Sequence, residues 1–397
     1  MSSTRRLNVA MIGHGFMGAA HSQGWRVAPR FFELEARPTM TLVVGRTAGA
    51  VAVAATKWGW AESATDWREA IARDDIDVID IVTPGDSHAD IAIAALEAGK
   101  HVLCEKPLAN TVDEAMAMAD AATRAAARGV FAMLGHTYRR VPAATFARDL
   151  VAAGRLGDIH QVRASYQQDW LTDPATPLVW RLQKEHAGSG ALGDIGAHII
   201  DLSQFITGMR LDSVSGTLET IIARRPILQS SSGLGGTGGT ELGDVTVDDV
   251  ALFTGRFDSG VLGIFEATRF ATGRKNALRV EVSGSKGALA FDLEDLNSLQ
   301  FYDATVDATL QGFTKILVTE PEHPYIAAWW PAGHMLGYEH AFSNQVKDFV
   351  DAITSGTQPT PSFDDGLQVQ RVLAAVESSS NNGSAWTAIT HESGSPS

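Results

Sequence analysis

The sequence has little of several features that would place it in particular classes of protein. Its 397 residues include one cysteine, Cys104, which excludes an intramolecular disulfide and any metal site built on cysteines. No apolar run approaches the roughly 20 residues that cross a bilayer, and the run Leu7–Ile12 is too short for a signal peptide. We therefore expect a cytoplasmic protein that has no membrane partner.

Basic residues are also scarce. The chain has 32 Lys and Arg against 46 Asp and Glu, which gives a formal net charge of −14. Such an acidic surface repels the phosphates of nucleic acids, so no nucleic-acid partner is expected. The composition is 45% hydrophobic and 20% charged, the balance of a globular protein, and the length favours two domains.

The first third of the chain alternates short apolar strands with helices. The expected strands are 7–12, 40–44, 78–82, 100–104 and 130–134, and the helices between them are 19–27, 48–58, 89–98 and 112–128. This alternation predicts a parallel, doubly wound sheet, so residues 1–136 are expected to form a Rossmann domain.

Residues 137–378 have a different pattern, in which strands follow one another with few helices. Strands are expected at 159–167, 213–222, 250–257, 260–268, 278–284, 287–292 and 298–302, and helices at 142–153, near 193–206, at 337–355 and near 365–378. Together with the first domain this predicts an α/β protein, whose second, α+β domain has a large, mainly antiparallel open sheet. The Ser- and Gly-rich stretch 229–243 is expected to be a loop, and 379–397 a frayed polar tail.

A glycine-rich loop follows the first expected strand. Gly13, Gly15 and Gly18 match the Gly-x-Gly-x-x-Gly pattern and open a helix with Phe16 and Met17 between them. The first glycine permits a tight turn, the second lets the backbone approach a pyrophosphate, and the third allows close packing of helix and strand. The loop therefore predicts dinucleotide binding, with a simple glycine-rich turn as the alternative.

The end of the second strand bears on the choice of dinucleotide. It reads Val44-Gly45-Arg46 and lacks the carboxylate that binds the ribose 2′-hydroxyl in NAD-selective folds. Arg46 is a candidate contact for a 2′-phosphate or for adenine, unless it is simply a solvated loop residue. The sequence therefore permits NAD(P), that is, either NAD or NADP.

Two further motifs resemble a known family. The first runs from Thr83-Pro84 through His88 to the segment 98–109, which contains Glu105-Lys106-Pro107; the second is Gly-Ala-Leu-Gly-Asp-Ile-Gly-Ala-His-Ile-Ile-Asp-Leu at 190–202. With the glycine loop, these motifs identify the chain as a member of the glucose–fructose oxidoreductase / inositol dehydrogenase / MocA (Gfo/Idh/MocA) family over about 7–363. The resemblance implies that cofactor contacts come from Thr83, Pro84, His88, Glu105 and Lys106.

The resemblance also implies a catalytic group of Lys106, Asp194 and His198. Lys106 follows the end of an expected parallel strand, where open α/β sheets bind ligands, although a surface pair with Glu105 is the alternative. Asp194 and His198 are spaced i, i+4 and would share one helix face, which suits proton transfer. The resemblance implies that His198 is the general base and that Asp194 orients it or binds a neighbouring hydroxyl; a helix-stabilising ion pair or a metal site are alternatives. No metal is expected, because hydride transfer to nicotinamide needs none.

The substrate candidates come from a more specific resemblance. The segments 167–171, 177–181, 188–190 and 323–339 are similar to the levoglucosan-dehydrogenase-like branch of sugar and glycoside 3-dehydrogenases. The candidate contacts are Tyr138, Gln168, Trp180, Arg181, Asp194 and His198, with the Trp329-Trp330 pair and Glu339 also considered. Aromatic rings suit the apolar faces of sugars, but core packing is the alternative for Tyr138 and the tryptophans.

The resemblance implies oxidation of a ring hydroxyl, typically at C3, of a sugar, anhydrosugar or glycoside. The alternatives are a redox-neutral glycosidase that oxidises, eliminates, adds water and re-reduces, or an inositol dehydrogenase. A non-catalytic dinucleotide sensor is disfavoured because Lys106, Asp194 and His198 are all present. Relatives assemble through the open face of the second sheet, so a homodimer or homotetramer is expected.

Overall fold

The structure is a computed structural model that describes residues 5–232 and 235–390. The chain forms two compact units. The first contains the described residues up to Pro142 and Thr319–Leu367. The second contains Ala143–Ser230, Gly235–Val318 and the described residues from Gln368 onward. Among the described residues, no helix combines the length and the apolar character needed to cross a bilayer.

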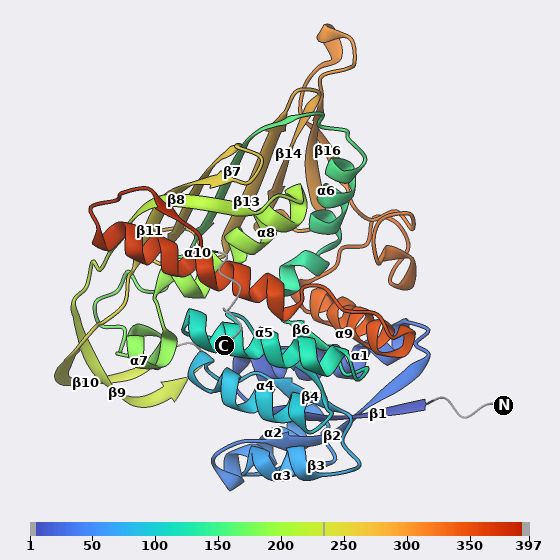
Figure 1. Cartoon of the computed structure of the whole chain (residues 1–397), viewed down its shortest axis with the longest axis vertical. Helices are drawn as coiled ribbons and strands as arrows, with labels where there is room; N and C mark the ends of the chain where they lie inside the picture. Colours follow the sequence, from blue (N-terminus) through green and yellow to red (C-terminus); the bar gives the residue numbers. More distant parts are fainter. Residues whose placement is uncertain (1–4, 233–234, 391–397) are drawn as a thin grey trace. The chain divides into compact units, whose positions relative to one another are not determined.

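The first unit contains a six-stranded parallel sheet with the order β3-β2-β1-β4-β5-β6 (blue to teal in Figure 1). Its strands are β1 (Arg5–Ile12), β2 (Ala36–Val44), β3 (Glu62–Ala64), β4 (Val78–Ile81), β5 (His101–Cys104) and β6 (Ala132–Leu134). Its helices are α1 (Phe16–Phe31), α2 (Ala48–Trp58), α3 (Trp67–Ala72), α4 (His88–Glu97), α5 (Val112–Ala126) and α9 (Tyr338–Ser355). The predicted doubly wound sheet is thereby confirmed.

Both faces of this sheet are buried. Successive side chains of a strand point to opposite faces, so Val9 and Met11 of β1 enter one core and Ala10 and Ile12 the other. The first core also contains Val346, Phe349, Val350 and Ile353 of α9. A helix from near the end of the chain therefore completes the unit that the first residues begin.

The second unit contains a nine-stranded sheet with the order β16-β15-β14-β13-β7-β12-β11-β8-β17 (Figure 1). Its strands are β7 (Ile159–Gln167), β8 (Leu211–Glu219), β11 (Val250–Phe257), β12 (Leu262–Thr268), β13 (Ala277–Gly284), β14 (Gly287–Asp292), β15 (Ser298–Asp303), β16 (Thr314–Leu317) and β17 (Thr387–Ala388). Only β7 and β12 pair in parallel within the described sheet, which confirms the mainly antiparallel prediction. The helices are α6 (Pro142–Ala152), α7 (Lys184–Ala187), α8 (Ala197–Thr207) and most of α10 (Phe363–Asn381).

The expectation of a loop at 229–243 is wrong. The described part of this stretch belongs to β9 (Arg224–Ser232) and β10 (Gly235–Asp244), which pair as a two-stranded sheet, and 233–234 lie outside the described residues. The glycines let these strands lie close together: a Cβ at Gly236 would come within 2.0 Å of the Ser230 carbonyl oxygen. Here glycine marks close backbone approach within a strand rather than a turn.

The expectation of a frayed tail after residue 378 is also wrong for the part that is described. α10 continues to Asn381, and β17 pairs antiparallel with β8. The serines that suggested disorder hydrogen-bond to β8, because the Ser379 and Ser380 hydroxyl oxygens accept from the backbone N–H groups of Gly216 and Leu218. Residues 391–397 lie outside the described residues.

Candidate active site

The glycine loop joins β1 to α1 and leaves the N-terminus of that helix accessible. Gly13 has φ +109°, and a Cβ there would lie 2.8 Å from the Val82 carbonyl oxygen, so only glycine fits. α1 has Gly15 as its N-cap, no side-chain cap and no acidic residue in its first turn, and the space around Gly15 is open. Unsatisfied amides and a positive helix end suit a phosphate, so the loop fits a dinucleotide.

Other predicted cofactor residues lie around this loop. Phe16 is half-exposed, Met17 packs partly against the first core, and Arg46 is exposed just after β2. Thr83 and Pro84 follow β4, where the Thr83 hydroxyl accepts a 2.7 Å hydrogen bond from Ser87. An NADP contact by Arg46 stays a prediction.

His88 has a different environment from the one the motif suggested. It is buried, with Nδ1 3.0 Å from the Pro107 carbonyl oxygen and Nε2 2.9 Å from the Thr83 carbonyl oxygen. The imidazole thus links the loop after β4 to the loop after β5. Its direct contact with a cofactor stays a prediction, while its support of Thr83 and Pro107 follows from these distances.

The turn after β5 carries the Glu105-Lys106-Pro107 motif. Lys106 is half-buried, its peptide bond to Pro107 is cis, and Glu105 is buried behind it. The Glu105 backbone N–H donates to the Ile81 carbonyl oxygen at 2.9 Å, which ties the turn to β4. The Glu105 side chain in turn accepts a 3.1 Å hydrogen bond from the Lys106 backbone N–H.

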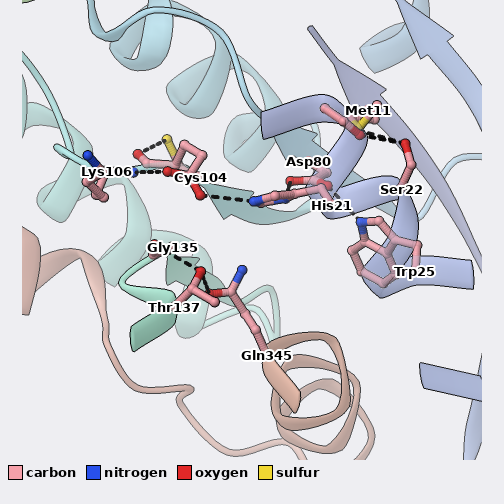
Figure 2. Close-up of polar contacts among 12 residues, drawn as sticks. Met11, His21, Ser22, Trp25, Asp80, Cys104, Lys106, Gly135, Thr137 and Gln345 are labelled. Atoms are coloured by element: carbon pink, nitrogen blue, oxygen red, sulfur yellow. Dashed lines mark hydrogen bonds and ion pairs between the residues drawn. The ribbon is translucent and has the colours of Figure 1, made fainter. Parts of the chain in front are cut away.

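A histidine that the motifs did not reveal lies behind this turn. His21 of α1 is buried, with Nδ1 2.9 and 3.0 Å from the two Asp80 carboxylate oxygens and Nε2 2.9 Å from Glu105 Oε1. The Trp25 indole N–H also donates to Asp80 at 2.7 Å. Figure 2 shows the imidazole beside Asp80 and pointing toward the Cys104–Lys106 turn. Burial favours neutral His21, but the two carboxylates outweigh it and raise the pKa of His21 to about 10.

This shift predicts a pH dependence of stability. The pKa of His21 is raised from an ordinary 6.5 to about 10, so its stabilising effect is complete below pH 6.5 and is lost as the pH rises to about 10. Within that window the free energy of unfolding should fall by about 1.4 kcal/mol per pH unit for one proton. Thermal melts from pH 6 to 10 should show a steeper decline for the wild type than for His21→Gln. Parallel curves would contradict a charged, paired His21.

Aromatic side chains of the first unit lie near the same turn. Tyr138, in the turn Thr137–Arg140, is buried, and its ring centre is 6.4 Å from that of Tyr338 at the start of α9. Tyr338 also stacks on Phe16 of the glycine loop at 6.4 Å. Burial, with the nearby Tyr138 and Glu105, raises the pKa of Tyr338, so its hydroxyl stays protonated. Tyr338 was not predicted as a site residue, because nothing in the sequence places α9 beside the glycine loop.

Asp194 and His198 lie in the second unit on an irregular helix. Asp194 belongs to a π-helical turn, Leu192–Gly196, which runs directly into α8, where His198 lies. Regular α-helical spacing therefore does not hold between them; π turns of this kind are frequent at functional sites. The half-buried Asp194 carboxylate lies 3.7 Å from Arg269 Nη1, and the His198 ring lies edge-on to Tyr166 with centres 5.8 Å apart.

Arg269 is fully buried beside Asp194. Its Nη2 donates to the Asp248 carbonyl oxygen at 2.9 Å and lies 4.0 Å from Asp249 Oδ1. Nε and Nη1 of Arg269 make no hydrogen bond within the described residues, so electrostatic pairing with the two carboxylates compensates much of its buried charge. Arg269 was not predicted, because a single arginine after an apolar strand carries no sequence signature.

Of the predicted substrate residues of the second unit, Trp180 and Arg181 contact each other, whereas Gln168 contacts residues that were not predicted. The Arg181 guanidinium lies 4.4 Å from the centre of the Trp180 ring, and both side chains are half-buried. Gln168 donates to Asn276 Oδ1 at 2.9 Å and accepts from the Trp170 indole at 3.1 Å. Within the part of the chain that the structure describes, each end of the Gln168 amide keeps one further hydrogen-bonding position.

The Trp329-Trp330 pair divides between core and surface. Trp329 is buried against Phe31 and Phe32, and its indole donates to Asn344 at 3.1 Å. This packing matches the alternative that a tryptophan is a core residue. Trp330 is 43% exposed and touches Phe31 edge-on.

Three features together define a dinucleotide-dependent oxidoreductase. They are a parallel sheet with a glycine loop, a lysine turn at the carboxyl edge of that sheet, and a second sheet domain with an Asp/His helix. Comparison with protein families agrees. The model described as "Oxidoreductase family, NAD-binding Rossmann fold" matches residues 7–134, and "GFO/IDH/MocA C-terminal domain" matches 145–290. The chain belongs to the Gfo/Idh/MocA family of oxidoreductases, and the prediction of NAD is confirmed at that level.

Individual relatives match over nearly the whole chain. Levoglucosan dehydrogenase of Pseudarthrobacter phenanthrenivorans is 40% identical over 94% of this chain and 95% of its own. A crystal structure of an oxidoreductase domain protein from Kribbella flavida has a TM-score of 0.93 at 60% identity and covers 98% of this chain and 100% of that one. Levoglucosan dehydrogenase in complex with NADH and levoglucosan has a TM-score of 0.91 at 39% identity, with coverage of 98% and 100%.

Proposed function

We propose that this protein is an NAD(P)-dependent dehydrogenase that oxidises a ring hydroxyl, at C3, of a sugar, anhydrosugar or glycoside. The observation that carries the proposal is the near full-length similarity to levoglucosan dehydrogenase in a chain that also keeps Lys106, Asp194 and His198. We further propose that residues 1–136 bind the dinucleotide and that 137–378 supply substrate binding and oligomerisation.

In this mechanism the side chains orient the hydroxyl and handle its proton. His198 accepts the hydroxyl proton as general base, and Asp194 orients His198 or binds a neighbouring hydroxyl. Lys106 donates a hydrogen bond to the reacting oxygen and shares in the proton transfer. Arg269, 3.7 Å from Asp194, pairs with that carboxylate and holds it in place. A nicotinamide cofactor would supply the hydride acceptor for this reaction.

The cofactor would be held by backbone amides of the glycine loop and by the loops after β2, β4 and β5. The residues proposed for this role are Gly13, Gly15, Phe16, Met17, Gly18, Arg46, Thr83, Pro84, His88, Glu105 and Lys106. Because the loop after β2 has no carboxylate to repel a 2′-phosphate and carries the exposed Arg46, we propose that NADP is accepted as well as NAD.

The substrate would be recognised by Tyr138 and by side chains of the second unit. The Trp180 ring offers an apolar face to a sugar, and Arg181 and the free positions of the Gln168 amide offer hydrogen bonds to hydroxyls. We also propose a homodimer or homotetramer, because the sheet exposes an apolar stripe: Leu252, Leu262 and Ile264 are 49, 43 and 48% exposed.

A redox-neutral glycosidase is the second candidate, because the same residues serve both reactions. Oxidation at C3 acidifies the hydrogen at C2, so elimination can expel the C1 substituent before water adds and the ketone is reduced again. Lys106 and His198 would handle the protons in each step.

A two-channel assay tests the proposal. The purified protein is incubated with NAD⁺ or NADP⁺ and a panel of free sugars, anhydrosugars, inositols and aryl glycosides, and nicotinamide reduction and aglycone release are followed together. We expect reduction without cleavage, with levoglucosan among the substrates. Cleavage that requires cofactor but gives no net reduction would replace the dehydrogenase by the glycosidase, and preference for inositols would replace the sugar class.

A further inference from the structure

The proposed proton chemistry gives no role to a deeply buried charged cluster of the first unit, of which only Glu105 is a proposed cofactor contact. Asp80 and His21 are 0 and 1% exposed, and Glu105 is 4% exposed. Taking a carboxylate out of water costs several kcal/mol unless it is paired and hydrogen-bonded, and here two carboxylates share one imidazole. Such a cluster is costly to bury, so its place in the fold is informative.

The cluster connects the two loops that the proposed chemistry depends on. His21 lies on α1, three residues beyond Gly18, and thus within one turn of the glycine loop. Asp80 is in β4, and Glu105 directly precedes Lys106. A chain of hydrogen bonds of 2.9 to 3.1 Å therefore runs from Asp80 through His21 and Glu105 to the backbone N–H of Lys106.

Glu105 has little freedom within this chain. Its Oε1 accepts from His21 and its Oε2 accepts from the Lys106 backbone N–H, so a hydrogen bond fixes each carboxylate oxygen. On a further side the backbone of Gly135 lies so close that a Cβ there would come within 2.8 Å of Oε1. The other groups around the cluster are the Trp25 indole, the Phe342 ring 5.4 Å from His21, the buried Cys104 thiol, and the Tyr338 hydroxyl.

We propose that His21 is a positioning residue for the reaction, which acts through Glu105 to fix the Lys106 turn relative to the glycine-loop helix. The proposal rests on the role given to Lys106 under the proposed function. A positive His21 suits this positioning role, because it hydrogen-bonds to both carboxylates at once. The three residues His21, Asp80 and Glu105 then have a net charge of −1. The neutral ring has one N–H and could donate to only one of them.

The test is a kinetic comparison of His21→Gln with a matched control. His101→Gln replaces another buried histidine of the same unit, in β5, whose Nδ1 accepts from the Phe131 backbone N–H. With NAD⁺ and levoglucosan, or the best sugar of the panel, we expect His21→Gln to lower kcat roughly 10- to 100-fold, the cost of a slightly misplaced reacting group. The KM of the sugar and the Kd of NADH should change by less than about threefold, and His101→Gln should leave all three unchanged.

A second variant separates positioning from simple stability. His21→Gln/Asp80→Asn has the same net charge as the wild-type trio and keeps an amide that can donate to Glu105. We expect it to recover the melting temperature and most of kcat. If His21→Gln lowers the melting temperature but keeps wild-type kcat in folded protein, the role is structural and the proposal is wrong.

A readout that needs no turnover completes the test. Competitive acetylation of the Lys106 amine, measured against pH by mass spectrometry, should differ between the wild type and His21→Gln but not between the wild type and His101→Gln. Identical Lys106 reactivity in all three proteins would overturn the proposal. If Lys106→Met is itself active, the role of Lys106 is wrong; if Lys106→Met is inactive and His21→Gln is fully active, only the positioning role fails.

Discussion

Replacing Lys106 by methionine is expected to lower kcat by roughly 10²- to 10⁴-fold, the usual contribution of a positioned proton-transfer group. Methionine has a similar length but no charge and no donor, so the hydroxyl loses its hydrogen bond in the transition state. NADH affinity should change far less, because the proposed phosphate contacts come from the glycine loop on a different segment of the chain. Steady-state kinetics measure kcat, and a fluorescence titration with NADH measures the NADH affinity separately.

Lys57→Met is the matched control for this experiment. Lys57 is exposed in α2 of the same unit, so its loss removes a charge without touching the β5 turn. We expect wild-type kcat and KM for the control. Near-normal turnover in Lys106→Met with NADH bound would remove lysine from the mechanism and leave His198 as the main proton acceptor.

Replacing Arg269 by methionine is expected to have the largest effect on stability, about 3–5 kcal/mol in the free energy of unfolding. Methionine fills much of the space but leaves Asp249, which is fully buried, and Asp194 without their guanidinium. Removing one partner of a buried ionic cluster leaves an uncompensated charge, which is the costly case. Calorimetry should show a marked fall in the melting temperature of the variant.

Arg279→Met provides the comparison for Arg269. Arg279 pairs with Asp292 at 2.7 Å between neighbouring strands of the same sheet, but both side chains are more than 30% exposed. A surface pair of this kind contributes less than about 1 kcal/mol. Equal losses of stability in the two variants would mean that Arg269 contributes packing and not charge compensation.

The sequence predicted the limits of those helices and strands that local residue patterns define. The limits of α2, β7, β11 and β14 agree with the structure, because apolar periodicity and turn residues define them. The prediction for 229–243 was wrong because glycine was interpreted as flexibility, whereas the two-stranded sheet of β9 and β10 uses it for close approach of the strands. The short β3 and α3 were missed since neither is long enough to show a period.

The site was predictable where a motif of adjacent residues carries the chemistry, as in the glycine loop and the Glu105–Pro107 turn. The residues around these motifs were not. His21 contacts Asp80 and Glu105, which are 59 and 84 residues away in the sequence. Arg269 contacts Asp194, which lies on a different secondary-structure element. A single buried histidine or arginine has no periodicity, and its partners become visible only when the strands are placed beside one another.

The position of α9 constrains how the chain becomes folded during synthesis. Val346, Phe349, Val350 and Ile353 cover the same apolar face as Leu7, Val9 and Met11, although more than 300 residues separate the two groups in the sequence. The ribosome must release nearly the whole polypeptide before that face can be closed, so the growing chain carries an incomplete core for most of its translation. The first unit begins with the first strands of the chain and is closed only by α9, so a fragment that ends before α9 would expose an aggregation-prone surface.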